Sequence, residues 1–193
     1  MTTEALNAPS ASAWVFDVHE IARKVGSMHE EQKTLPAPEG LSVPLIGVEP
    51  GSRVPVELRF EGVHEGVLVT GQASLSINGE CGRCLDPISY TYDAHFQELF
   101  FHPEQQLDSE DDTETSVIVD DKVNLEPLLR TAVVGELPFQ PLCNEDCMGL
   151  CDQCGVRLDD EPEHHHDIVD PRWEALRGLS TLGEEAPQEH NKG

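Results

Sequence analysis

The sequence has few basic residues. Among 193 residues, 12 Lys and Arg stand against 37 Asp and Glu, which gives a formal net charge of −25 at pH 7. Proteins that bind RNA unaided use clustered Lys and Arg to release counterions from the phosphates. The acidic surplus therefore disfavours direct RNA binding. It either attracts a basic partner or simply keeps the protein soluble, and net charge alone does not separate these two interpretations.

Long apolar runs are also missing. No stretch approaches the ~20 apolar residues that a membrane-spanning helix needs, and residues 1–12 carry one acid and no base, unlike a secretory signal with its basic start and apolar centre. We therefore expect a cytoplasmic protein with no membrane partner. In a reducing compartment, closely spaced cysteines bind metal more often than they form disulfides.

Motifs of catalysis are absent as well. The sequence contains no phosphate-binding glycine loop, no serine nucleophile elbow and no H-E-x-x-H pair. Pairs of acidic residues are too common in this composition to indicate catalytic carboxylates. We expect a protein that is not an enzyme and takes no small-molecule substrate. A Cys-dependent enzyme remains an alternative because the chain has six cysteines.

Apolar residues at every second position dominate the middle of the chain. Three runs show this pattern: Val54, Val56, Leu58 and Phe60; then Val67, Val69, Gly71, Ala73, Leu75 and Ile77; then Ile88, Tyr90, Tyr92, Ala94 and Phe96. Such alternation predicts strands with one buried face, and the short connections favour an antiparallel meander. We expect the meander to curve strongly or to close into a barrel, which would protect its edges.

The flanking segments complete an α+β fold with a small Cys-rich end. We expect strands at residues 14–18 and 41–48, a mobile acidic loop at 104–121, and a helix at 125–136 that Asn124 caps. The predicted organisation is a disordered tail at 1–13, a β-rich core at 14–138, a Cys-rich zinc-binding segment with a closing helix at 139–180, and a disordered tail at 181–193.

Four cysteines lie close together in the Cys-rich segment. They form C-x3-C-x3-C-x2-C, and four thiolates suit tetrahedral zinc; they are Cys143, Cys147, Cys151 and Cys154. We expect one structural Zn²⁺, because a metal would offset the ordering entropy of a segment that can build little core. A site of four thiolates leaves no open position for catalysis.

Other residues offer alternative ligands. Cys81 and Cys84 form an isolated C-x2-C between antiparallel strands, where a thioredoxin-like redox role is disfavoured. A rival model therefore gives one zinc the two C-x2-C pairs: Cys81, Cys84, Cys151 and Cys154. His164 and His166 could also serve, since imidazole nitrogen binds zinc. The other interpretation of the run His164–His166 is a solvated stretch of an acidic loop.

Four segments, in this order, resemble the YceD family of large ribosomal RNA subunit accumulation proteins. They are E-C-G-R-C-L at 80–85, N-L-E-P-L-L at 124–129 with E-L-P-F-Q-P-L-C at 136–143, M-G-L-C-D-Q-C-G at 148–155, and D-P-R-W-E-A-L at 170–176. The third resembles the knuckle of zinc-type members, and the His run and acidic loop resemble those of actinobacterial members. The resemblance covers about residues 14–180.

The resemblance implies a role in accumulation of 23S ribosomal RNA and hence in large-subunit assembly. Genes of family members commonly lie next to the gene of a small basic ribosomal protein. Some members lack part of the C-terminal Cys set, which implies that the metal is structural. We therefore expect a binding factor for a basic large-subunit ribosomal protein or a pre-ribosomal particle. The acidic loop supplies the candidate partner-binding residues: Glu110, Asp111, Asp112 and Glu114.

Direct binding to rRNA is the alternative. Such a module would need a local basic patch on the sheet. Arg53, Arg59 and Arg83 are the only candidates for its nucleus.

Overall fold

The computed structural model describes residues 13–104 and 116–166. These residues divide into two compact units, one that ends at Cys147 and one that begins at Met148. The proposed partner-binding residues 110–114 and the closing helix expected near residue 170 lie outside the described residues. Within the described ranges, no helix has the length and apolar character that crossing a bilayer requires.

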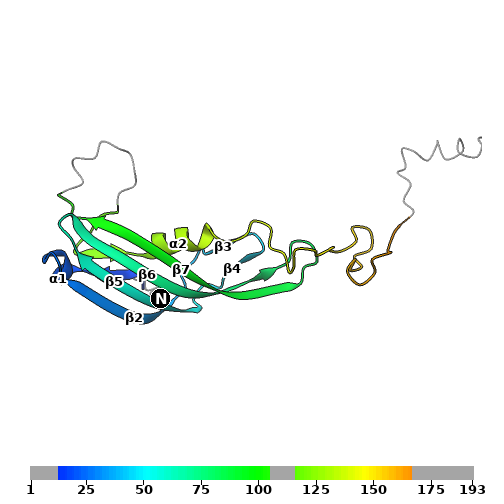
Figure 1. The fold of residues 1–193 in the computed structure, drawn as a ribbon, viewed down its shortest axis with the longest axis horizontal. Coiled ribbons are helices and arrows are strands. Elements are labelled where there is room, and N and C mark those ends of the chain that lie inside the picture. The colour runs from blue at the N-terminus through cyan, green and yellow to red at the C-terminus, as the bar shows by residue number, and fades with distance from the viewer. Residues whose placement is uncertain (1–12, 105–115, 167–193) are drawn as a thin grey trace, which may run out of the picture. The chain divides into compact units, whose positions relative to one another are not determined.

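The first unit is built on a six-stranded antiparallel sheet (Figure 1). In pairing order its strands are β2 (Met28–Pro36), β5 (Arg53–Gly62), β6 (Gly66–Glu80), β4 (Ile46–Val48) and β3 (Ser42–Val43), with β7 (Pro87–Phe101) on the other side of β6. The central strand β6 pairs with β7 along its whole length. The expected antiparallel meander is therefore present as β5, β6 and β7 in succession.

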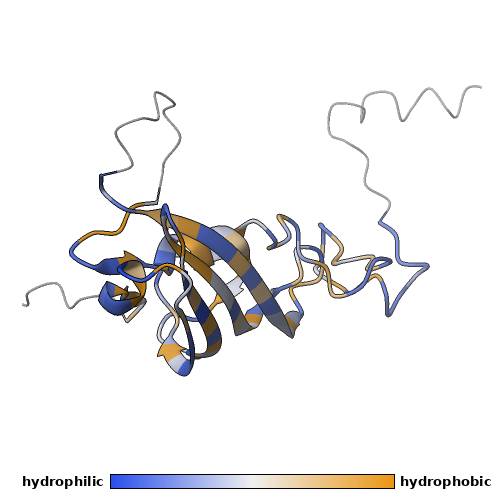
Figure 2. Ribbon diagram, turned by 60° about the vertical axis from the view of Figure 1, so that its left-hand side comes forward, coloured by the Kyte–Doolittle hydropathy of each residue, from blue (hydrophilic) through white to orange (hydrophobic). Residues whose placement is uncertain are grey.

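Side chains alternate between the two faces of this sheet. The predicted apolar positions of β5 and β6 are buried, whereas the residues between them are exposed or half-buried. Figure 2 shows the same alternation as bands of opposite hydropathy along the strands. The pattern weakens at the start of β7, where Tyr90 remains 40% exposed although Ala94 and Phe96 are buried.

A helix and a small second sheet cover the apolar face. The helix is α2 (Glu126–Val134), and the second sheet pairs β1 (Val15–Asp17) with β8 (Lys122–Asn124). A short helix, α1 (His19–Ala22), follows β1. One core cluster joins Trp14, Leu129 and Val133 to the apolar residues of the large sheet. The indole of Trp14 also donates a hydrogen bond to the carbonyl of Pro36 at 2.8 Å.

The expectation of a barrel-like or strongly curved sheet is wrong. The sheet is open: among the described residues, β2 and β7 lie on opposite sides and do not pair with each other. Because α2, β1 and β8 bury the apolar face, the sheet does not need to close on itself. The edge strand β2 carries Glu30, Glu31 and Lys33, and such charges discourage pairing with another chain.

The ends of α2 and the segment at 41–48 differ in detail from the prediction. The side-chain oxygen of Asn124 accepts a hydrogen bond from the backbone N–H of Glu126 at 3.1 Å, although the cap position itself is held by Leu125, one residue later than predicted. The helix ends at Val134, two residues earlier than predicted. The single strand expected at 41–48 is instead a tight hairpin of β3 and β4, in which Leu45 adopts a φ of 76°.

Candidate metal centres

The turn between β6 and β7 positions Cys81 and Cys84. The N–H of Leu85 donates to the carbonyl of Cys81 at 2.9 Å, and the N–H of Cys81 donates to the carbonyl of Asp86 at 2.8 Å. Leu85 has a φ of 63°, in the left-handed region. This conformation turns the chain back so that Pro87 pairs with Glu80, and it leaves both cysteines buried, at 0% and 5% exposure.

Cys143 and Cys147 come from the segment that follows α2. Two hydrogen bonds attach this segment to the β6–β7 turn. The N–H of Gly82 donates to the carbonyl of Pro141 at 2.8 Å, and Nη1 of Arg83 donates to the carbonyl of Cys147, also at 2.8 Å. The segment therefore lies against the tip of the hairpin, with Cys147 buried and Cys143 exposed.

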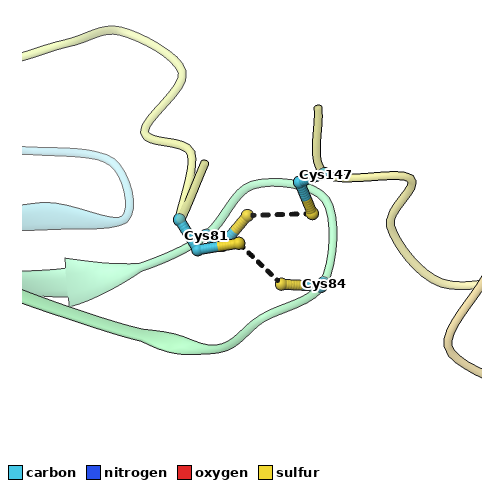
Figure 3. A group of neighbouring side chains, drawn as sticks. Cys81, Cys84 and Cys147 are labelled. Atoms are coloured by element: carbon cyan, nitrogen blue, oxygen red, sulfur yellow. Dashed lines mark hydrogen bonds between the residues drawn. The ribbon is translucent and has the colours of Figure 1, made fainter. Parts of the chain in front are cut away.

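The four sulfurs of this first group all lie within 4.8 Å of one another. The Sγ atoms of Cys81 and Cys147 are 3.8 Å apart, and those of Cys84 and Cys143 are 3.5 Å apart. Figure 3 shows Cys81, Cys84 and Cys147 pointing toward one another. Tetrahedral zinc with bonds of ~2.3 Å to sulfur places its ligands about 3.8 Å apart, whereas a disulfide requires ~2.05 Å. The group could therefore hold a metal ion.

The electrostatics of the first group favour thiolate formation at one cysteine. The pKa of Cys81 is lowered to about 6, mainly because the backbone N–H of Cys84 donates to its sulfur, with burial acting in the opposite direction. The pKa of Cys143 is raised, mainly through its sulfur contact with Cys84. A thiolate is the form that binds metal, so Cys81 is available as a ligand near neutral pH.

The second group lies in the second unit. Its four ligand atoms, from Cys151, Cys154, His164 and His166, also lie within 4.8 Å of one another. Backbone N–H groups lower the pKa of Cys151 to about 6, that of Gln153 contributing most. This group, too, could hold a metal ion.

The structure distributes the four clustered cysteines over both groups. Cys143 and Cys147 lie with Cys81 and Cys84, whereas Cys151 and Cys154 lie with the two histidines. It gathers neither the set of four clustered cysteines nor the rival set of two C-x2-C pairs. His164 and His166, considered as alternative ligands, are brought together with one of these pairs. Which atoms bind metal stays a prediction.

Two residues contact the candidate metal-binding residues in ways that the sequence did not indicate. Nη1 of Arg83, a candidate for RNA contact from the sequence, donates to the Cys147 carbonyl, and its contact with RNA stays a prediction. Glu161 lies with Oε2 3.4 Å from Nδ1 of His164. A carboxylate three residues before a histidine on a turn could have signalled this contact, but acidic residues are too frequent in this chain to make the signal specific.

Comparison with known proteins places both C-x2-C turns inside one family. The family model described as large ribosomal RNA subunit accumulation protein YceD matches residues 69–180. An uncharacterized protein of Mycobacterium tuberculosis (strain ATCC 25618 / H37Rv) is 40% identical over 177 residues, which cover 91% of this chain and 84% of the relative. An uncharacterized protein of Mycobacterium leprae (strain TN) is 36% identical over 176 residues, covering 90% and 80% respectively.

A more distant relative comes from another bacterial group. The uncharacterized protein YlbN of Bacillus subtilis (strain 168) is 29% identical over 118 residues, or 58% of this chain and 67% of the relative. No solved structure gives a significant match. Because the family model matches more than half of the 193 residues, and a relative with 40% identity spans most of both chains, this chain belongs to the YceD family.

Proposed function

We propose that this protein is a non-enzymatic factor for accumulation of 23S rRNA and assembly of the large ribosomal subunit. It acts by holding a basic large-subunit ribosomal protein, alone or within a pre-ribosomal particle, on its acidic surface. The family description, which names large ribosomal RNA subunit accumulation, supports the first part. The net charge of −25 supports the second, because a field of that sign attracts cations and repels phosphates.

The main observation that favours a basic protein over RNA as the partner is the arrangement of the basic side chains. Four of them form ion pairs within the chain: Lys33 with Glu31, Arg59 with Glu61, Arg130 with Glu126, and Arg157 with Asp160. Exposed pairs of this kind contribute only about 0–1 kcal/mol to stability. Their consequence here is electrostatic: each of these four cations is neutralised by a neighbouring acid, so an approaching partner meets the acidic surplus.

The same contacts weaken the case for direct rRNA binding. Arg59 lies 2.6 Å from a carboxylate oxygen of Glu61, and Arg83 is held by the carbonyl of Cys147. Of the three arginines that the sequence offers as a basic nucleus, two are therefore directed at partners within the chain. Unaided RNA binding needs several such charges free to face phosphates.

The first cysteine group supports a structural metal rather than a Cys-dependent enzyme. We infer that Cys81, Cys84, Cys143 and Cys147 bind one Zn²⁺. Four protein thiolates complete the tetrahedral coordination of zinc, so no position is left for a substrate or an activated water. Such a zinc would cross-link the tip of the β6–β7 hairpin to the segment after α2, and so hold together parts of the chain that the core does not join.

The test is an association experiment with the full-length protein. Rates would be measured for basic large-subunit ribosomal proteins and for 23S rRNA fragments across a salt series. We expect capture of the ribosomal protein to slow sharply as the Debye length falls from ~10 Å at 0.1 M salt to ~3 Å at 1 M, because steering is lost first. Neutralising the acidic loop (Glu110→Gln, Asp111→Asn, Asp112→Asn, Glu114→Gln) should slow capture at low salt.

A matched control separates this loop from net charge in general. Glu20, Glu39, Glu49 and Glu65 are exposed on the first unit, and changing all four to Gln alters the net charge by the same amount. If both quadruple variants slow capture equally, the loop is not the contact surface. If the wild-type protein binds rRNA tightly without any protein partner, the proposed mode of action is wrong.

A further inference from the structure

The second unit repeats the backbone of the first C-x2-C turn, between β6 and β7. In the first turn, the N–H of Leu85 donates to Cys81 and the N–H of Cys81 donates to Asp86. In the second, the N–H of Gly155 donates to the carbonyl of Cys151, and the N–H of Cys151 donates to the carbonyl of Val156, both at 2.8 Å. Gly155 has a φ of 74°. The two C-x2-C pairs are thus presented by the same kind of turn.

Three electron-pair donors converge beside this second turn. Sγ of Cys154 lies 3.2 Å from Nε2 of His164 and 3.3 Å from Nε2 of His166, and the two Nε2 atoms are 2.9 Å apart. Tetrahedral zinc with two sulfur and two nitrogen ligands places these atoms about 3.3–3.6 Å apart. The observed spacings are within a few tenths of an ångström of that geometry. A cation between these atoms would replace their mutual repulsion with coordination.

Glu161 prepares His164 for this role. Its carboxylate lies 3.4 Å from Nδ1 of His164, and its carbonyl accepts a hydrogen bond from the backbone N–H of His164 at 2.9 Å. A carboxylate at Nδ1 favours the proton on that nitrogen and leaves the lone pair on Nε2, which faces Cys154. His165, between the two candidate ligands, instead has its Nδ1 3.1 Å from the carbonyl of Glu163.

Apolar burial does not account for the order of this segment. The buried apolar residues of the described chain end at Cys147, so residues 148–166 contribute none. Their backbone is nevertheless folded: Leu150 bridges to Arg157, and the N–H of Leu158 donates to the carbonyl of Gly149 at 3.0 Å. Fixing each residue costs roughly 1–2 kcal/mol of backbone entropy. A bound metal is a source of folding free energy that such a segment can use.

We propose that Cys151, Cys154, His164 and His166 bind a second metal ion, of the zinc class, separately from the first cysteine group. The chain then binds two metal ions rather than the single zinc expected from the cysteine spacing. The second ion orders residues 148–166, with Glu161 as the residue that positions His164. This assignment rests on the geometry of the second unit and is independent of the proposed role in rRNA accumulation.

The test is metal analysis of the full-length protein, purified under reducing conditions without chelator. We expect about two zinc ions per wild-type chain and about one in the double variant His164→Ala/His166→Ala. The variant His165→Ala is the matched control, because it removes the neighbouring imidazole that faces Glu163, and it should keep both ions. In the double variant, the amide NMR signals of residues 148–166 should lose the chemical-shift dispersion of a folded segment. The signals of the first unit should keep theirs.

Substitution with Co²⁺ distinguishes the two ligand sets. In a Cys84→Ser variant, the remaining cobalt should show the weaker thiolate charge-transfer absorption of a site with two sulfurs. In the double His variant it should show that of a site with four. If the double His variant retained the same zinc content and cobalt spectrum as wild type, the second site would be refuted. If wild type bound one ion that only the His variant lost, the second site would stand and the first would fall.

Discussion

Leu85 and Gly155 occupy the same position in two turns that share their backbone hydrogen bonds. Each follows the second cysteine of a C-x2-C pair, each donates its N–H to the carbonyl of the first cysteine, and φ is 63° at Leu85 and 74° at Gly155. Only glycine adopts this left-handed conformation without cost. The second turn therefore has the residue that its geometry favours, and the first does not.

Replacing Leu85 with glycine should stabilise the first unit. The left-handed conformation costs a residue with a side chain roughly 1–2 kcal/mol, and the extra entropy of glycine in the unfolded chain offsets about 0.5–1 kcal/mol of the gain. Leu85 is 56% exposed, so the loss of its remaining burial offsets a further part of the gain. We expect a net gain of at most about 0.5 kcal/mol in the free energy of unfolding of the zinc-loaded protein, measured with urea.

Val119 provides the control for that change. It is also an exposed apolar residue, at 64%, but its φ is not positive, and it pairs with Lys122 in a β-bridge. Val119→Gly should therefore lower stability. A loss of stability in Leu85→Gly as well would mean that the Leu85 conformation is not strained.

Gly71 is needed because the Phe96 ring packs over it. The two residues are opposite each other on β6 and β7, and a Cβ added at Gly71 would clash with two ring carbons of Phe96. Gly71→Ala should lower the free energy of unfolding by about 1–3 kcal/mol through overpacking. Gln72→Ala, on the opposite face of the same strand, should have a much smaller effect.

A double variant tests whether the ring is the cause. Phe96→Leu removes the two ring carbons that a Cβ at residue 71 would meet and leaves Leu58 Cδ2 at 3.0 Å, so Gly71→Ala should cost less in that background. An unchanged cost would place the strain elsewhere. Both comparisons use the denaturant concentration at the unfolding midpoint. They require that the slope of the unfolding free energy against denaturant is the same in all variants.

Local patterns predicted more of this fold than of its candidate metal centres. Strands β5 and β6 were predictable because burial on one face imposes a period of two along the sequence itself. Asn124 likewise indicated the start of α2, because its side chain contacts Glu126, only two positions later in the sequence. The open sheet was not predictable, because closure depends on what covers the apolar face.

The two candidate ligand groups depend on contacts that local sequence spacing does not encode. Cys81 and Cys147 are 66 residues apart in sequence, and they meet because the β6–β7 hairpin ends where the segment after α2 passes. Sequence spacing favoured the four cysteines that are closest in the chain. Spacing carries no information about which pair returns to the hairpin. His164 and His166 were named as alternative ligands, but the sequence did not indicate that both lie beside Cys154.

Arg83 should support the first metal centre rather than bind RNA. Its guanidinium donates to the carbonyl of Cys147 at 2.8 Å. A hydrogen bond from a charged donor contributes roughly 1.5–3 kcal/mol, and the low end applies to this exposed side chain. We expect Arg83→Ala to weaken zinc binding at the first group by about tenfold in chelator competition.

Arg53 serves as the comparison for Arg83. It is exposed at the start of β5, where it pairs with Pro36 of β2, so Arg53→Ala should leave zinc affinity unchanged. Equal effects of the two substitutions would indicate a general charge effect instead of support for the Cys147 carbonyl. If neither substitution alters zinc affinity, the contact is not important to the centre.

The contact between His19 and Asp121 links α1 to the turn before β8. Its contribution to stability should depend on pH in the acid range. The His19 ring lies 2.8 Å from the Asp121 carboxylate, and this hydrogen bond is the main reason that the pKa of Asp121 is lowered from 3.8. A lowered pKa means that the pair stabilises the fold above the unfolded pKa and that this contribution is lost as pH falls through the folded pKa. The pair is exposed, so solvent screening keeps this contribution small.

NMR titration of the Asp121 carboxyl carbon measures this effect directly. In His19→Ala the pKa of Asp121 should rise toward 3.8. His95→Ala, which removes a histidine from β7 on the large sheet, should leave the titration as in wild type. A pKa that is the same in His19→Ala and wild type would show that the contact does not hold the carboxylate.

The shared metal centre is tested most directly by the zinc content of two single variants, Cys84→Ser and Cys147→Ser, measured on folded, reduced, full-length protein. The structure places these cysteines in one group although they come from the β6–β7 turn and from the segment after α2. Each substitution should therefore remove the same zinc ion and leave the second. If Cys147→Ser lost a zinc ion while Cys84→Ser kept the full wild-type content, the cysteines of the hairpin would not share a metal with those of the later segment.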